Sequence, residues 1–154
     1  MAANGDQFAV SLQQMHDDLT ELTNRMDKER KHWRTEGTNN EKKVKEAEAL
    51  MDKARVKYYG LAEDYDRVRT GEKGTGKIFT VKGPKSAEKH EEELQRKMEA
   101  ADREYQTRVA AAQTQRQDNL STLRPQAVKR LQELIRECDA ALVMQLQKFG
   151  MLAS

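Results

Sequence analysis

Apolar residues recur along both halves of the chain with alternating spacings of three and four. In the first half the series runs from Phe8 to Met26 and resumes from Val44 to Val68. In the second half a similar series runs from Leu94 to Leu152. This period places one apolar stripe along one side of an α-helix, which is the pattern of a coiled-coil seam. The pattern predicts two long helical arms.

A glycine-rich segment separates the two arms. Residues 70–85 contain four glycines and a proline, a composition that ends a helix. We therefore divide a single module, 1–154, into a first helical arm at 6–69, a basic glycine-rich tip loop at 70–85 and a return arm at 86–153. Pro125 lies inside the return arm, and its missing backbone donor predicts a kink near Ser121 or Thr122.

Arms of nearly equal length predict an all-α fold, a long antiparallel coiled-coil hairpin. Each arm of ~65 residues would be on the order of 100 Å long at 1.5 Å per residue. Folding back at the loop would pair positions whose numbers add to about 154, the length of the chain. The apolar stripe at Leu131, Leu134 and Ile135 is too broad for one partner helix. We expect a third helix or a second copy of the chain to cover it.

The composition agrees with long, thin helices and indicates the cellular compartment. Charged residues make up 35% of the chain and hydrophobic residues 36%, too few to fill a thick core. Cys138 is the single cysteine, so no internal disulfide forms and a reducing, cytoplasmic setting is expected. Its place on the stripe predicts a buried side chain. The sequence has no long apolar run and no apolar signal core at its start, so we expect neither a membrane span nor export.

Motifs that suggest enzymatic chemistry are incomplete. Residues 71–77 match the GxxxxGK spacing of a P-loop, but Ile78 stands where the magnesium-binding Ser or Thr belongs, and no strand precedes the loop. Glu29 and His32 have the ExxH spacing of a di-iron site, but no second such pair exists. We therefore predict no catalytic residue, no metal and no cofactor: the chain is not expected to be an enzyme.

The net charge of +2 conceals basic stretches. Residues 25–45 hold eight bases and four acids, residues 69–89 six and two, and residues 124–136 four and one. In the predicted register Arg30 faces Arg124, so two of these stretches converge. Such a surface attracts anions, and a merely solvated charged face is the alternative interpretation. Nucleic acid is not an expected partner, because few aromatic residues interleave with the bases.

Several motifs resemble an F-BAR domain. Residues 29–33 carry a basic Arg-Lys stretch, and 47–58 resemble the lysine-rich helix that follows it and ends in Lys57-Tyr58. Residues 101–105 and 124–142 are similar to the return helix and to the helix after it. The likeness covers nearly the whole chain, and is nearest to fungal proteins that join an F-BAR domain to a Rho-GTPase-activating domain. The chain resembles the middle and C-terminal part of the domain, and no GTPase-activating segment is recognised in it.

The resemblance implies a peripheral membrane scaffold in the cytoplasm, with a homodimer in the full domain. Its basic face would bind anionic lipids such as phosphoinositides and phosphatidylserine. Candidate lipid-binding residues, taken from the resemblance and from the predicted convergence of the arms, are Arg30, Lys31, Arg34, Lys42, Lys43, Lys45, Arg124, Lys129 and Arg130. Bases around apolar residues at the tip would add a shallow membrane contact, through Lys73, Lys77, Phe79, Lys82 and Lys85. The alternative function is a structural coiled-coil scaffold for cytoskeletal or septum proteins that does not bind lipid directly.

Overall fold

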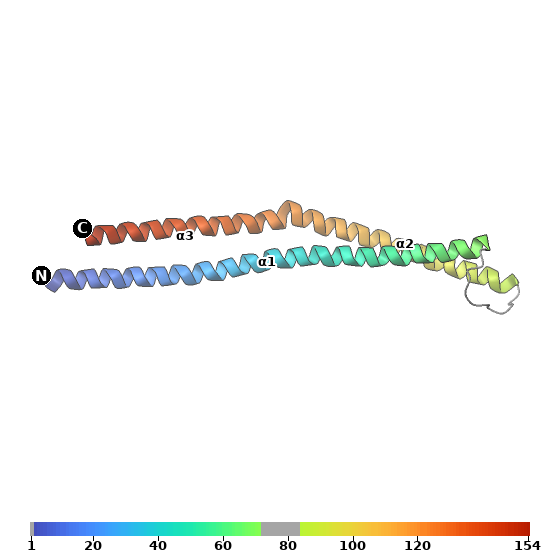
Figure 1. Cartoon of the computed structure of the whole chain (residues 1–154), viewed down its shortest axis with the longest axis horizontal. Coiled ribbons are helices and arrows are strands. Elements are labelled where there is room, and N and C mark those ends of the chain that lie inside the picture. The colour runs from blue at the N-terminus through green and yellow to red at the C-terminus, as the bar shows by residue number, and fades with distance from the viewer. Residues whose placement is uncertain (1, 72–83) are drawn as a thin grey trace. The chain divides into compact units, whose positions relative to one another are not determined.

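The computed structural model describes residues 2–71 and 84–154, which are helical almost throughout. The elements are α1 (Ala2–Thr70), α2 (Pro84–Asp118), the π-helical turn η1 (Asn119–Leu123) and α3 (Arg124–Ala153) (Figure 1). Within the described ranges there is no strand. The predicted all-α class is confirmed. Helix α1 begins at Ala2, ahead of the expected start at residue 6.

The chain forms two compact units. Unit 1 combines residues 1–41 with residues 119–154, and unit 2 comprises residues 42–118. In unit 1 the first part of α1 runs antiparallel to α3, and in unit 2 the second part of α1 runs antiparallel to α2 (Figure 1). The predicted antiparallel pairing of the arms is therefore confirmed within each unit.

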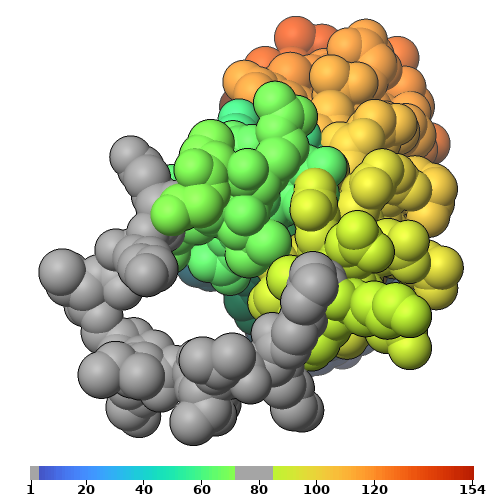
Figure 2. Space-filling view, turned by 90° about the vertical axis from the view of Figure 1, so that its right-hand side faces the viewer, coloured from blue at the N-terminus to red at the C-terminus, as the bar shows by residue number. Residues whose placement is uncertain are grey.

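Small side chains hold unit 2 together. Val44 and Ala54 of α1 and Ala101 and Ala112 of α2 are its buried apolar residues in the described part of the chain. Alanine lets two helix backbones approach closely, so little apolar volume is needed between them. Figure 2 looks onto the end of this unit, where α1 ends (green) and α2 begins (yellow-green).

Two contacts join the middle of unit 2. The rings of Tyr58 and Tyr105 stack with centroids 6.3 Å apart and planes inclined by 18°. Beside them Lys57 Nζ donates to Glu104 Oε2 at 2.8 Å. This ammonium is also the main cause that lowers the pKa of the Glu104 carboxyl.

Unit 1 has an equally thin core. Ala127 and Leu134 of α3 are buried, and a Cβ added at Gly37 of α1 would lie 3.8 Å from the Cβ of Ala127. Further along the pair, Arg25 Nη1 donates to Glu137 Oε2 at 3.2 Å, and Gln145 Nε2 donates to Asp18 Oδ2 at 3.3 Å. These cross-helix contacts fix which residues face each other.

The predicted register of the arms is wrong. The cross-helix hydrogen bonds of both units join residues whose numbers add to between 160 and 165, not to about 154. Arg25 therefore faces Glu137 rather than Lys129 and Arg130, and Arg124 faces Glu41 rather than Arg30. The prediction used the arm lengths alone, whereas opposite charges and the small residues of the seam set the pairing.

The predicted interruption of the return arm near Pro125 is confirmed. Helix α2 ends at Asp118, η1 covers Asn119–Leu123, and Pro125 occupies the first turn of α3. A proline in the first turn lacks only a donor that would have no helical partner there. Asn119 in η1 is 3% exposed, and its Nδ2 donates to Glu41 Oε1 at 3.0 Å.

Cys138 is exposed, so its predicted burial is wrong. The residue lies on the apolar stripe of α3, but at the edge of the seam with α1. Leu134 packs into that seam and is buried, whereas Cys138 is left beside a part of the stripe that α1 does not cover.

Candidate anion-binding surface

A cluster of bases occupies α1 at residues 25–34 in unit 1. Arg30 Nη2 and Lys31 Nζ each lie 2.6 Å from a different oxygen of Asp27. The hydrogen bond from Lys31, followed by that from Arg30, lowers the pKa of the Asp27 carboxyl. Both bases remain more than half exposed, so each can still reach a ligand in solvent. Arg34 is exposed and has no acidic partner within 4 Å among the described residues.

A second set of bases lies on α3 of the same unit. Arg124 Nη2 is 2.7 Å from Glu41 Oε1, the oxygen that also accepts from Asn119. Lys129 and Arg130 share Glu133, at 3.9 and 3.1 Å. The guanidinium of Arg130 also lies over the indole of Trp33, 6.0 Å from the ring centroid. A cation over the face of tryptophan is a favourable contact.

The contact between Trp33 and Arg130 brings the two basic stretches of unit 1 together. Trp33 lies between Lys31 and Arg34 on α1, and Arg130 follows Lys129 on α3. The predicted convergence of the stretches therefore exists in unit 1, although the residue pairs differ from those that the sequence predicted. Residues 25–36 and 124–137 together contain nine bases and five acids.

The bases do not all point the same way. Because successive helical residues turn by about 100°, Arg30 and Arg34 share one side of α1, whereas Lys31 lies about 100° from Arg30. Lys42, Lys43 and Lys45 are exposed but belong to unit 2, where Lys42 lies 3.8 Å from Glu46. The structure thus places Arg30, Lys31, Arg34, Arg124, Lys129 and Arg130 in one unit.

The predicted tip contact lies mostly outside the described residues. That holds for Lys73, Lys77, Phe79 and Lys82. Lys85 is exposed in the first turn of α2.

Sequence reasoning missed a polar cluster next to the basic site. It consists of Asn119, Glu41 and Arg124, with the buried Asn40 beside Glu41. Glu41 receives hydrogen bonds from both Asn119 and Arg124, so it is neutralised by one base and held by one amide. Asparagine at two positions of the apolar stripe was the available signal, because polar residues at seam positions commonly specify helix register.

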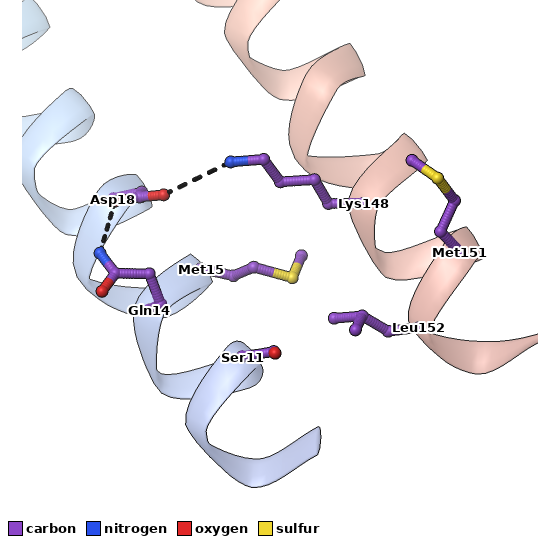
Figure 3. A pocket seen from close by; sticks show the side chains of 7 residues that line it. All are labelled: Ser11, Gln14, Met15, Asp18, Lys148, Met151 and Leu152. Atoms are coloured by element: carbon purple, nitrogen blue, oxygen red, sulfur yellow. Dashed lines mark hydrogen bonds and ion pairs between the residues drawn. The ribbon is translucent and has the colours of Figure 1, made fainter. Parts of the chain in front are cut away.

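A shallow pocket opens at the end of unit 1, apart from the basic residues of 25–36 and 124–137. Its volume is about 350 Å³, and Figure 3 shows Met15 and Leu152 pointing toward one another across it. At its rim Asp18 lies 3.8 Å from Lys148 and accepts a hydrogen bond of 2.9 Å from Gln14. The one carboxylate is already satisfied, and the walls are mainly apolar, so the pocket offers contact area rather than reactive groups.

The described residues offer neither a group that could hold a metal ion nor a helix that could cross a membrane. No group of three or more His, Cys, Asp or Glu side chains in residues 2–71 and 84–154 is placed to hold a metal ion. In the same ranges, no helix combines the length and the apolar character needed to cross a bilayer.

The fold and the site define a helical scaffold with paired antiparallel helices and a basic cluster. Comparison with known families is more specific: the model for GEM-interacting protein-like FCH domains matches residues 4–153. The chain belongs to this family, whose FCH domains are of the F-BAR type. Domains of this type serve generally as membrane-associated scaffolds and form dimers.

Two curated relatives agree with this assignment. Rho GTPase-activating protein 45 of Mus musculus is 34% identical over 112 residues, and that of Pongo abelii is 32% identical over 112 residues. In each case the match covers 66% of this chain and 10% of the relative, so the chain spans about a tenth of these proteins. The predicted F-BAR resemblance and its link to Rho-GTPase-activating proteins are confirmed, here through mammalian relatives.

Proposed function

We propose that the chain binds anionic phospholipid membranes through the basic cluster of unit 1, as a peripheral, non-enzymatic scaffold module in the cytoplasm. The observation that carries the proposal is the contact between Trp33 and Arg130, which brings basic stretches from two helices side by side in unit 1. Each base close to an anionic leaflet contributes roughly 1 kcal/mol, so several together are needed for stable binding. Phosphoinositides and phosphatidylserine are the lipids we propose, because both present anionic headgroups.

The ion pairs of the cluster are compatible with this role. Asp27 and Glu133 each hold two bases, and those bases stay more than half exposed. Exposed ion pairs of this kind contribute little to stability, so an incoming phosphate can compete for the bases. Lys42, Lys43 and Lys45 of unit 2, and the tip bases with Phe79, are proposed as additional contacts of the same chemistry.

The proposal is tested by co-sedimentation with vesicles. Wild-type protein should pellet with vesicles containing phosphatidylserine and a phosphoinositide, and not with neutral vesicles, and 0.5 M salt should release it because salt screens such attraction. The triple variant R30E/K31E/R34E should lose at least about tenfold in affinity, since three bases at roughly 1 kcal/mol each are reversed. Circular dichroism should show unchanged helix content.

A matched control separates this site from the overall charge. The variant R96E/K97E/R103E makes the same change of charge on α2 of unit 2 and should keep most of the binding. Equal losses in the two variants would mean that net charge, not this cluster, drives binding. Full binding by R30E/K31E/R34E would show that the cluster is the wrong site.

A second function is favoured by a different observation. Many large apolar side chains of α3 are exposed, which suits a coiled-coil scaffold that binds another helix. Such a scaffold for cytoskeletal or septum proteins would not need lipid, and absence of pelleting with any vesicle would favour it. In either role we propose that the chain acts as a homodimer in the full domain, within a protein of Rho GTPase signalling as its relatives' names suggest.

A further inference from the structure

The end of unit 1 formed by the first residues of α1 and the last residues of α3 carries a groove. One part of it is the pocket of about 350 Å³ shown in Figure 3. A second hollow, of about 550 Å³, lies next to it along the first turns of α1. Ser11 and Leu152 line both hollows, so the two are continuous. We call this pair of hollows the terminal groove.

The walls of the terminal groove are largely apolar, and its apolar residues are open to solvent. Met15 and Leu152 point toward one another across the first hollow (Figure 3). Val10 lines the second hollow and Met151 the first, and they are 69% and 73% exposed. Met144, also exposed, precedes Met151 by seven residues and therefore lies on the same side of α3. Large apolar side chains that surround a hollow in solvent are typical of a binding surface.

The groove is distinct from a second apolar line on α3. That line consists of exposed residues spaced by seven, Val128, Ile135, Leu142 and Phe149. Met151 follows Phe149 by two positions, which places it about 160° away around the helix. The terminal groove and the second apolar line therefore belong to different sides of unit 1.

Acidic residues dominate the charge of this end of unit 1. Residues 4–24 of α1 contain four acids, Asp6, Asp17, Asp18 and Glu21, and no lysine or arginine. Residues 140–153 of α3 contain one base, Lys148, and no acid. Lys148 already lies 3.8 Å from Asp18. The other three carboxylates have no lysine or arginine within 4 Å in the part of the chain that the structure describes.

These three carboxylates flank the groove. Asp6 lines the second hollow. Asp17 and Glu21 continue the line of Val10 and Gln14, with spacings of four, three and four, and Gln14 lines the first hollow. Hydrogen bonds from His16 and then Gln13 lower the pKa of the Asp17 carboxyl, which is therefore ionised at neutral pH. The groove is thus apolar along its floor and anionic along its rim.

We propose that the terminal groove binds an amphipathic helix of another protein, with large apolar residues on its contact face and lysines or arginines beside them. Hollows of this size hold a few apolar side chains, and helices dock in such grooves through residues spaced by three and four. From Asp6 to Glu21 the groove and its rim extend about 22 Å along α1, or roughly four turns of a partner helix. The carboxylates select a basic partner, because unlike charges attract and like charges repel across a contact.

This inference goes beyond the membrane role proposed above, because its partner is cationic. An anionic bilayer would be repelled by the rim of Asp6, Asp17 and Glu21. The acidic end and the basic cluster of unit 1 would therefore serve partners of opposite charge, and binding at the groove can be measured without lipid.

Fluorescence anisotropy with the full chain tests the proposal. The probe is a dye-labelled helical peptide of about 15 residues, with leucines spaced by three and four and lysines beside them. A second peptide has glutamate in place of every lysine. Wild-type protein should bind the lysine peptide at least about tenfold more tightly, since three carboxylates face it. The variant D17K/E21K should reverse this preference and bind the glutamate peptide more tightly. Such a gain of binding requires a folded protein, so unfolding could not produce it.

Matched controls locate the site. E88K/E92K makes the same change of charge at two exposed residues four positions apart on α2, and should keep the wild-type preference. M151S should weaken the lysine peptide about threefold or more because it removes an apolar contact, whereas V56S, at a residue 68% exposed in unit 2, should not.

Three results would overturn the proposal. The first is equal binding of the two peptides by wild-type protein, and the second is an equal effect of D17K/E21K and E88K/E92K. The third is self-association of the wild type, measured by sedimentation equilibrium, that D17K/E21K abolishes, because a second copy of the chain would then occupy the groove.

Discussion

Units 1 and 2 are both pairs of antiparallel helices, but they leave different surfaces exposed. On α3 of unit 1 nine large apolar residues are exposed, whereas none of the described large apolar residues of α2 in unit 2 is. Unit 2 packs alanines and a stack of two tyrosines between its helices, and its exposed large apolar residues, Leu50, Val56, Tyr59 and Val68, all lie on α1. Pairing with α1 thus accounts for the apolar residues of α2. Helix α3, in contrast, exposes enough apolar surface for contact with a further helix. The difference shows that similar sequence periodicity can serve one partner or two.

The largest expected effect is on the core of unit 1. Leu134→Ala removes the one large buried side chain of α3 and should cost about 2–4 kcal/mol of unfolding free energy. Hydrogen exchange followed by mass spectrometry should show faster exchange in residues 4–41 and 119–154 and little change in unit 2. Equal acceleration in both units would mean that they unfold together, and would remove the distinction between them.

The reciprocal substitution tests unit 2. Ala101 is 2% exposed, so Ala101→Leu adds volume where the helices are closest and should cost about 1–3 kcal/mol. Chemical denaturation gives the free energy, and hydrogen exchange shows whether residues 42–71 and 85–118 are the ones affected. A neutral or stabilising result would show that unit 2 has free space between its helices and is not held by close packing.

A smaller effect is expected at the polar cluster of unit 1. Asn119→Ala removes the hydrogen bond to Glu41 but also removes a buried Oδ1 that has no partner among the described residues, so the net cost should be at most about 1 kcal/mol. Thermal unfolding measures it. A loss as large as that of Leu134→Ala would show that the cluster, rather than the apolar seam, sets the register of unit 1.

The smallest effect is the dependence on pH. Hydrogen bonds from Gln14 and then Gln145 lower the pKa of Asp18 in unit 1, and Lys57 lowers that of Glu104 in unit 2. A lowered carboxyl pKa stabilises the fold above the ordinary values of 3.8 for Asp and 4.5 for Glu, and this contribution disappears as the pH falls through the lowered value. Melting temperatures should therefore be flat from pH 7 to about 5 and decrease below about 4.

The variants D18N, in unit 1, and E104Q, in unit 2, measure how much each carboxyl contributes to this pH dependence. Each should reduce the decrease on acidification slightly, and the remaining decrease should come from the other carboxylates. A melting temperature that rises on acidification in wild-type protein would contradict the direction of both pKa shifts.

Periodicity predicted the helices, their antiparallel pairing and the interruption near Pro125, because these depend on local spacing and on proline chemistry. The register could not be predicted from arm lengths, since it depends on contacts such as Arg25 with Glu137 and Gly37 with Ala127. The basic stretches were found from charge counts, but their pairing within unit 1 needed the structure. The burial of Cys138 was predicted wrongly because a single apolar stripe was assumed on α3, which carries two.

The π-helical turn has a further consequence for how α3 is rotated about its axis. Buried positions Ala112 and Asn119 are seven residues apart, and Ala127 and Leu134 are seven apart, but Asn119 and Ala127 are eight apart. The turn therefore accommodates one residue more than the heptad count allows. If Asn119–Leu123 formed an ordinary α-helix with no residue removed, the rest of α3 would rotate by about 100° relative to α1. Gln126, Glu133 and Ala140 would then occupy the positions of Ala127, Leu134 and Ala141, so the π-helical turn is what keeps the apolar residues of α3 toward α1.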